Sequence, residues 1–191
     1  MCCGTKRLSE IACPPDCVYL ATAREHPPAA TVRQQQRDVA LLVEATRDLN
    51  ERQAQLFLLA AMLLLQYEPP ALQPLIDDDV IEAAAALAAT YETAAKGLIY
   101  EHRPPSLPAE RLVQALKPRL TEAGQRGGSA FERDAAVVFR QIGEAAARVR
   151  QLQPDNRHAF LDLVRRTIRQ PPDKNDERTA APADPPRLIV P

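Results

Sequence analysis

The stretch Ser129-Ala-Phe-Glu-Arg-Asp-Ala-Ala-Val-Val-Phe-Arg-Gln-Ile-Gly-Glu-Ala-Ala-Ala-Arg-Val-Arg-Gln-Leu152 decides the fold class of this chain. Its apolar residues recur at alternating spacings of four and three, at Phe131, Ala135, Val138, Ile142, Ala145, Val149 and Leu152. This spacing places them on one face of an α-helix. At the start of the helix, Ser129 and Glu132 have the spacing of a capping box, in which each side chain bonds the other residue's backbone amide. The stretch therefore predicts a long amphipathic helix.

Similar periodicity continues on both sides of this helix, between proline-rich breaks. The stretch from Ala29 to Tyr67 contains neither Gly nor Pro and predicts one very long first helix, although its polar part from Arg47 to Gln55 could hide a break. We expect further helices at about Asp79–Tyr100 and Leu107–Ala123, separated by a proline-rich segment, with a flexible turn over 124–128.

Single residues refine these boundaries. The acidic run Asp77-Asp78-Asp79 suits a helix N-terminus, where free amides favour negative charge. Pro118 predicts a kink or a two-piece helix. After Pro154, we expect Asp155 to cap a final helix, whose apolar stripe is Phe160, Leu161, Val164 and Ile168.

The composition agrees with a helical fold. The 191 residues are 46% hydrophobic but only 4% aromatic, with no Trp and six Gly, and Ala, Leu, Arg, Glu and Gln dominate. These residues favour helices and disfavour a β-sandwich or a Rossmann fold. We therefore predict an all-α fold, an up-and-down bundle of four to five helices with one very long first helix. The bundle spans residues 29–170, between a small Cys-rich head (1–28) and a disordered, Pro-rich tail (171–191).

The net charge and the lengths of the apolar stretches limit the kinds of partner that we expect. A net charge of −1 makes a dedicated nucleic-acid binder unexpected, although seven Arg lie between Arg140 and Arg169. No secretory signal is visible, and the longest apolar run, Leu56–Leu65, has ten residues, about half of a membrane span. We expect a soluble, cytoplasmic protein, with Leu56–Leu65 in a buried helix or in a homodimer contact.

All four cysteines lie in the head, at Cys2, Cys3, Cys13 and Cys17. A tetrahedral zinc site needs four converging ligands, and the three-residue gap between Cys13 and Cys17 suits one pair of them. Adjacent Cys2 and Cys3 diverge more readily, so His26 is an alternative fourth ligand. In a reducing compartment clustered cysteines favour a metal over structural disulfides. We predict a structural zinc site.

Three other interpretations of the head stay open. Cys13 and Cys17 could form a redox pair, although C-x3-C is not the usual redox motif. Cys2 and Cys3, followed by Lys6 and Arg7, could carry two acyl chains and anchor the protein to a membrane. The cysteines could also be reduced and inert.

Two segments suggest a relationship. They are Ile11-x-Cys13-Pro14-x-Asp16-Cys17-x-Tyr19-Leu20 and Ile99-Tyr100-Glu101-His102-x-x-x-Ser106-Leu107-Pro108-Ala109. In these segments the chain resembles a group of uncharacterised bacterial proteins with a Cys-rich head and a helical body. The resemblance implies a bacterial, cytoplasmic, metal-bearing protein and implies no activity.

No nucleotide-binding, hydrolase or metalloprotease motif occurs, and no catalytic residue is assigned. A polar cluster around Glu101 and His102 includes Tyr91, Tyr100 and the pair Glu92 and Lys96, which we expect to form an ordinary i,i+4 ion pair. Three hypotheses follow. The first is a non-enzymatic interaction or regulatory protein that binds a protein partner or itself. The second is a DNA-linked regulator using the Cys head and the Arg-rich final helices. The third is an enzyme with its site around Glu101 and His102.

Overall fold

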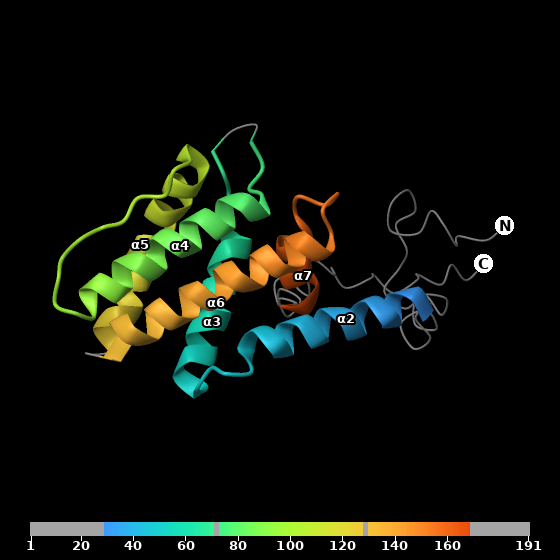
Figure 1. Ribbon diagram of the computed structural model, residues 1–191, viewed down its shortest axis with the longest axis horizontal. Coiled ribbons are helices and arrows are strands. Elements are labelled where there is room, and N and C mark those ends of the chain that lie inside the picture. Colours follow the sequence, from blue (N-terminus) through green and yellow to red (C-terminus); the bar gives the residue numbers. More distant parts are fainter. Residues whose placement is uncertain (1–28, 71–72, 128–129, 169–191) are drawn as a thin grey trace, which may run out of the picture.

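A computed structural model describes residues 29–70, 73–127 and 130–168 of the chain (Figure 1). All regular structure in these ranges is helical, so the predicted all-α class is confirmed there. The helices are α2 (Ala29–Thr46), α3 (Glu51–Gln66), α4 (Asp77–Ala94), α5 (Leu107–Gly127), α6 (Phe131–Leu152) and α7 (Ala159–Thr167). The predicted Cys-rich head and the predicted disordered tail lie outside the described residues.

The prediction of one very long first helix is wrong. α2 ends at Thr46 and α3 begins at Glu51. The break is made by Asn50, whose side chain accepts a hydrogen bond from the Gln53 amide at 3.0 Å. The Gln53 side chain accepts one from the Asn50 amide at 3.1 Å, which completes a capping box. Because these bonds satisfy the free amides of a new helix, the polar stretch between the two apolar patterns starts a second helix.

Three other boundaries differ from the predicted ones. α4 ends at Ala94, and Gly97 then adopts φ 79°, a left-handed conformation that favours glycine and turns the chain before Tyr100. α5 continues through Pro118 to Gly127 as one helix. It is therefore not divided into two pieces at Pro118, and the turn predicted over 124–128 does not begin at Gly124. Asp155 does not cap the final helix, because α7 begins only at Ala159.

The start of α6 agrees with prediction within the described residues. α6 begins at Phe131, with Ala130 at the cap position and no side-chain cap bond. Ser129 lies outside the described residues, so its capping box stays a prediction. Of the seven apolar positions of the opening stretch, five are buried in the core, Ala145 is half-buried against it, and Leu152 is exposed.

α4 and α6 form the central antiparallel pair of the fold. Arg140 near the start of α6 pairs with Glu92 near the end of α4, and Arg150 pairs with Asp78 at the opposite end. Between these pairs the helices approach closely, since a methyl group at Gly143 would lie 3.5 Å from the Ala84 Cβ atom. Small buried side chains line the contact. α5 packs on α4, α3 crosses behind α6, and α2 and α7 contact α6 and each other (Figure 1).

Tyr91 closes the core at one end of the α4–α6 pair. Its ring stacks on Phe139 with centroids 6.0 Å apart and meets Phe131 edge-on at 5.6 Å. Burial, and less strongly the negative charge of Glu132, raises the pKa of Tyr91 to about 12. This tyrosine therefore stays neutral and acts as a packing residue.

Asp77 joins the start of α4 to the start of α7. Its side chain is fully buried, and its two carboxylate oxygens accept hydrogen bonds from the amides of Phe160 at 2.9 Å and Leu161 at 3.2 Å. The Asp77 amide donates to the Arg157 carbonyl at 2.9 Å. Burial raises the pKa of Asp77, while the two amide donors oppose the rise. The acidic run Asp77–Asp79 starts α4, as predicted. The carboxylate of Asp77, however, caps α7 and not its own helix.

We expect Asp77→Ala to lower the free energy of unfolding by about 2 to 4 kcal/mol, because it leaves two buried amides of α7 without an acceptor. Urea unfolding followed by circular dichroism measures this loss.

The matched control is Asp78→Ala on the same turn. Asp78 bonds Arg150 at 3.3 Å, and both side chains are partly exposed. We therefore expect a loss below about 1 kcal/mol. Equal losses in the two variants would show that Asp77 does not hold α7.

Candidate functional site: a groove between α2 and α6

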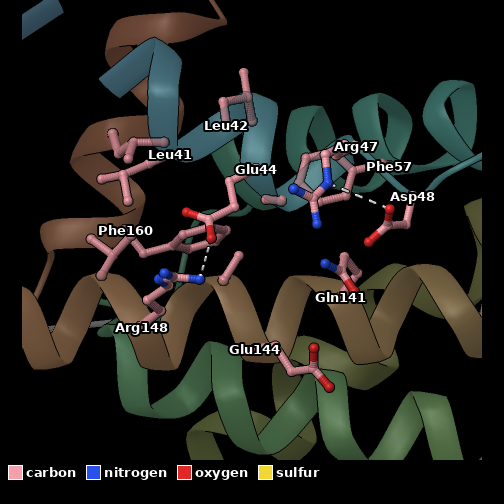
Figure 2. Close-up of a pocket in the computed structure, with 14 residues that line it drawn as sticks. Leu41, Leu42, Glu44, Arg47, Asp48, Phe57, Gln141, Glu144, Arg148 and Phe160 are labelled. Carbon is pink, nitrogen blue, oxygen red and sulfur yellow. Dashed lines mark ion pairs between the residues drawn. The ribbon is translucent and has the colours of Figure 1, made fainter. Parts of the chain in front are cut away.

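A hollow lies where α2 passes over α6 (Figure 2). We call it the α2–α6 groove. Its volume is about 210 Å³. Fourteen residues line it, from α2, the following turn, α3, α6 and α7. They are Leu41, Leu42, Glu44, Ala45, Arg47, Asp48, Phe57, Gln141, Glu144, Ala145, Arg148, Val149, Phe160 and Leu163.

The floor of the groove is apolar. Phe57 of α3 and Phe160 of α7 are almost fully buried beneath it. Ala45 and Ala145 line it from the two facing helices, and their short side chains leave the space that larger residues would fill. Because the floor is built from side chains already packed in the core, the hollow is a fixed feature of the fold.

The rim of the groove is charged, and four of its five charged side chains form ion pairs. Glu44 of α2 bonds Arg148 of α6 at 2.6 Å, across the groove, and Arg47 lies 3.5 Å from Asp48 (Figure 2). All four side chains are largely exposed, so each pair contributes little to stability. These charges give the rim polar contacts without giving it one dominant sign.

The lining residues do not form a catalytic set. None of the fourteen is Ser, Thr, Cys, His, Lys or Tyr, and of the three carboxylates in the lining Glu44 and Asp48 have arginine partners, which leaves Glu144 as a single carboxylate. Nucleophilic and acid–base catalysis both need an activated group held beside its base or acid. An apolar floor with a polar rim is instead the arrangement of a binding site.

A buried ion pair fixes the outer wall of the groove. Asp38 of α2 is 2% exposed and accepts two hydrogen bonds from Arg166 of α7, at 2.6 and 3.1 Å. Gln34 donates a third at 2.7 Å. The hydrogen bond that Arg166 donates to Asp38 is the main cause that raises the pKa of Arg166. The bidentate geometry sets both the position and the direction of α2 relative to α7.

We expect Arg166→Met to destabilise the protein by about 3 to 5 kcal/mol, because it leaves the Asp38 carboxylate buried without a cation. Asp38→Asn should cost less, because the Arg166 side chain is 41% exposed and stays solvated. Urea unfolding of both variants at neutral pH tests this order. The reverse order would contradict the assignment of Asp38 as the buried partner.

Sequence reasoning missed the residues that build the groove, although one signal was present. Asp38 lies three, four and seven residues before Leu41, Leu42 and Ala45, so it falls on the apolar face of its helix. A charge in that position is typical of a buried, paired side chain. Its partner, Arg166, lies far away in the sequence, and no comparable signal marks it as a buried, paired residue.

The predicted zinc ligands Cys2, Cys3, Cys13 and Cys17, and the alternative ligand His26, lie outside the described residues. The zinc site therefore stays a prediction. Across residues 29–70, 73–127 and 130–168, no group of three or more His, Cys, Asp and Glu side chains could hold a metal ion.

The polar cluster around Glu101 and His102 is divided in the structure. Glu92 pairs with Arg140 of α6 instead of Lys96, and Glu101 pairs with Lys117 of α5. Tyr91 points into the core, as described above.

His102 itself belongs to the loop after α4. Its amide donates to the Thr90 hydroxyl at 2.9 Å, and its ring meets Tyr100 edge-on at 4.7 Å. Its buried Nε2 atom has no hydrogen-bond partner among the described residues. These contacts fix the loop without bringing His102 together with Glu92 or Tyr91.

Most arginines of the Arg-rich final helices have carboxylate partners. Five of the seven form ion pairs, namely Arg140–Glu92, Arg148–Glu44, Arg150–Asp78, Arg165–Asp162 and Arg166–Asp38. Arg169 lies outside the described residues. The pairing neutralises most of this positive charge.

No protein-family model matches the chain, and searches of curated proteins and of solved structures return no similar protein. Among the described helices, none is both long enough and apolar enough to cross a membrane. The resemblance in the Cys-Pro-x-Asp-Cys segment stays a prediction.

Proposed function

We propose that this protein is a non-enzymatic interaction protein whose α2–α6 groove binds an apolar segment of a partner protein. The observation that carries this proposal is the apolar floor beneath a rim of paired charges. Aliphatic and aromatic side chains of a partner segment would cover the half-buried Leu41, Leu42 and Ala145 above the two phenylalanines, and its backbone would meet the charged groups of the rim. Removal of apolar surface from water supplies the affinity.

The other two hypotheses have less support. A DNA-linked regulator would need unpaired cations to replace the counterions of phosphate, whereas most arginines of the final helices have carboxylate partners. An enzyme around Glu101 and His102 would need them close to a further reactive group, and the cluster is divided. Both hypotheses stay predictions, which DNA retardation at low salt and activity screening would test.

Peptides selected from a displayed library on the wild-type protein should be rich in apolar residues and should depend on the groove. We expect Ala145→Leu to weaken their binding by at least about tenfold, because the added methyl groups fill the floor. Fluorescence anisotropy with the selected peptides measures the affinity.

The control is Ala115→Leu, a change of the same size at an exposed position of α5. It should leave the peptide affinity unchanged. Peptides that bind the Ala145→Leu variant as tightly as the wild type would overturn the proposed site.

We further propose that the Cys-rich head binds one structural zinc ion through Cys2, Cys3, Cys13 and Cys17. The support is the clustering of soft ligands and the spacing of Cys13 and Cys17. The full chain, purified without added zinc, should contain one zinc per chain, and its thiols should react only after a chelator removes the metal. Elemental analysis with thiol titration measures both. Metal-free protein with four freely reacting thiols would refute the zinc site.

A further inference from the structure

Three consecutive apolar residues are exposed in the loop between α4 and α5. Ile99 is fully exposed, and Leu98 and Tyr100 are each 60% exposed. Single exposed apolar side chains are normal on a protein surface, whereas a run of three is typical of an interaction site. We call Leu98–Tyr100 the apolar tip. None of its residues lines the α2–α6 groove, so the groove and the tip are separate surfaces.

Hydrogen bonds to the end of α4 hold the apolar tip in its exposed position. At the start of the tip, the Leu98 amide donates to the Thr93 carbonyl at 3.0 Å. At its end, the Thr93 hydroxyl donates to the Tyr100 carbonyl at 3.3 Å. Two residues further on, the His102 amide donates to the Thr90 hydroxyl at 2.9 Å. Because the backbone is bonded on both sides of the tip, the tip is a defined part of the fold and not a frayed helix end.

The loop that carries the apolar tip lies at an edge of the molecule. In Figure 1 it follows the end of α4 and forms the outer edge of the helical body, on the left of the view. The described helices lie behind it on one side only. A flat surface that approaches from this side therefore reaches the tip before it reaches the helices.

Positive charge surrounds the apolar tip. Lys96 precedes the tip and Arg103 follows it, and both are exposed and form no ion pair with another described residue. The one carboxylate of the segment 96–103, Glu101, pairs with Lys117 of α5. The whole chain has a net charge of −1, so this excess of positive charge is local. Cations beside exposed apolar residues suit a surface of anionic lipids, which attracts the cations and takes up the apolar side chains.

We propose that the apolar tip binds to the surface of membranes that contain anionic lipids. Leu98 and Ile99 enter the boundary between headgroups and acyl chains. Tyr100 lies at the level of the headgroups, because its ring is apolar and its hydroxyl is polar. Lys96 and Arg103 contact the lipid phosphates. The position of the loop at an edge and the cations on both sides of the tip favour a flat, anionic membrane surface over a partner protein.

Sedimentation of the full chain with lipid vesicles tests the proposal. We expect half of the protein to bind at about 1 mM lipid in vesicles of equal parts phosphatidylglycerol and phosphatidylcholine, and little to bind to pure phosphatidylcholine. Ile99→Glu should weaken binding at least about tenfold, because it places a charge in the interface. Leu152→Glu is the matched control, since Leu152 is 61% exposed at the end of α6. The control should bind like the wild type, and circular dichroism should show that both variants are folded.

A tryptophan in the tip tests the place of contact, because the chain itself contains no Trp. The fluorescence of Tyr100→Trp should shift to shorter wavelength on the anionic vesicles and be quenched by brominated lipid, whereas that of Leu152→Trp should not change.

Four results would each overturn the proposal. They are no binding of the wild type to the anionic vesicles, equal binding to pure phosphatidylcholine, undiminished binding of Ile99→Glu, and an unchanged spectrum of Tyr100→Trp. A tip that binds a partner protein instead would give the first result. Ala145→Leu should leave vesicle binding unchanged, so failure of the groove proposal and failure of the membrane contact are distinguishable.

Discussion

The positions of α7, α2 and the α2–α6 groove depend on the hydrogen bonds of one buried carboxylate, that of Asp77. α7 has only nine residues, and a helix of that length is not stable alone in water. Its first amides have no local side-chain cap, because the residue before the helix, His158, supplies none. Asp77 of α4 supplies the acceptors instead. α7 then presents Arg166 to Asp38, and this second buried carboxylate fixes α2. The order of dependence therefore runs from the α4–α6 pair through α7 to α2.

This order explains where the α2–α6 groove lies. Small side chains bring α4 and α6 close together, so their contact leaves no hollow. α2 is held by a polar anchor near its middle and by apolar side chains that pack on the core, and Ala45 and Ala145 line the groove beyond that anchor. Asp77 and Asp38, which are both buried and hydrogen-bonded, thus set the position of α2, the outer wall of the groove. Hydrophobic contacts alone would allow α2 to pack in more than one position. The result is a groove with fixed walls, which would reduce the entropic cost of binding the proposed partner segment.

The spacing of apolar residues correctly predicted helices such as α6, whose buried face follows from the local sequence. In α6, Val138, Ile142 and Val149 are buried as the spacing of four and three requires. The predictions failed where a single residue overrides a continuous apolar pattern, as Asn50 and Gly97 do. Asn50 and Gln53 have the spacing of a capping box, so that signal was present in the sequence. By contrast, Asp77 reaches residues 83 and 84 positions later, and Arg166 reaches Asp38 over 128 positions. No local pattern encodes such pairings, so the groove that they build could not be predicted.

Hydrogen exchange of the Asp77→Asn variant tests the order of dependence most directly. The substitution keeps the size of the side chain but weakens its capping of the Phe160 and Leu161 amides. We expect amides of α7 and of α2 to exchange faster together, because Asp77 holds the start of α7 and α7 holds α2 through Arg166. Amides in the α4–α6 pair should keep their wild-type protection. Faster exchange in α7 alone, or equally in all helices, would contradict the account.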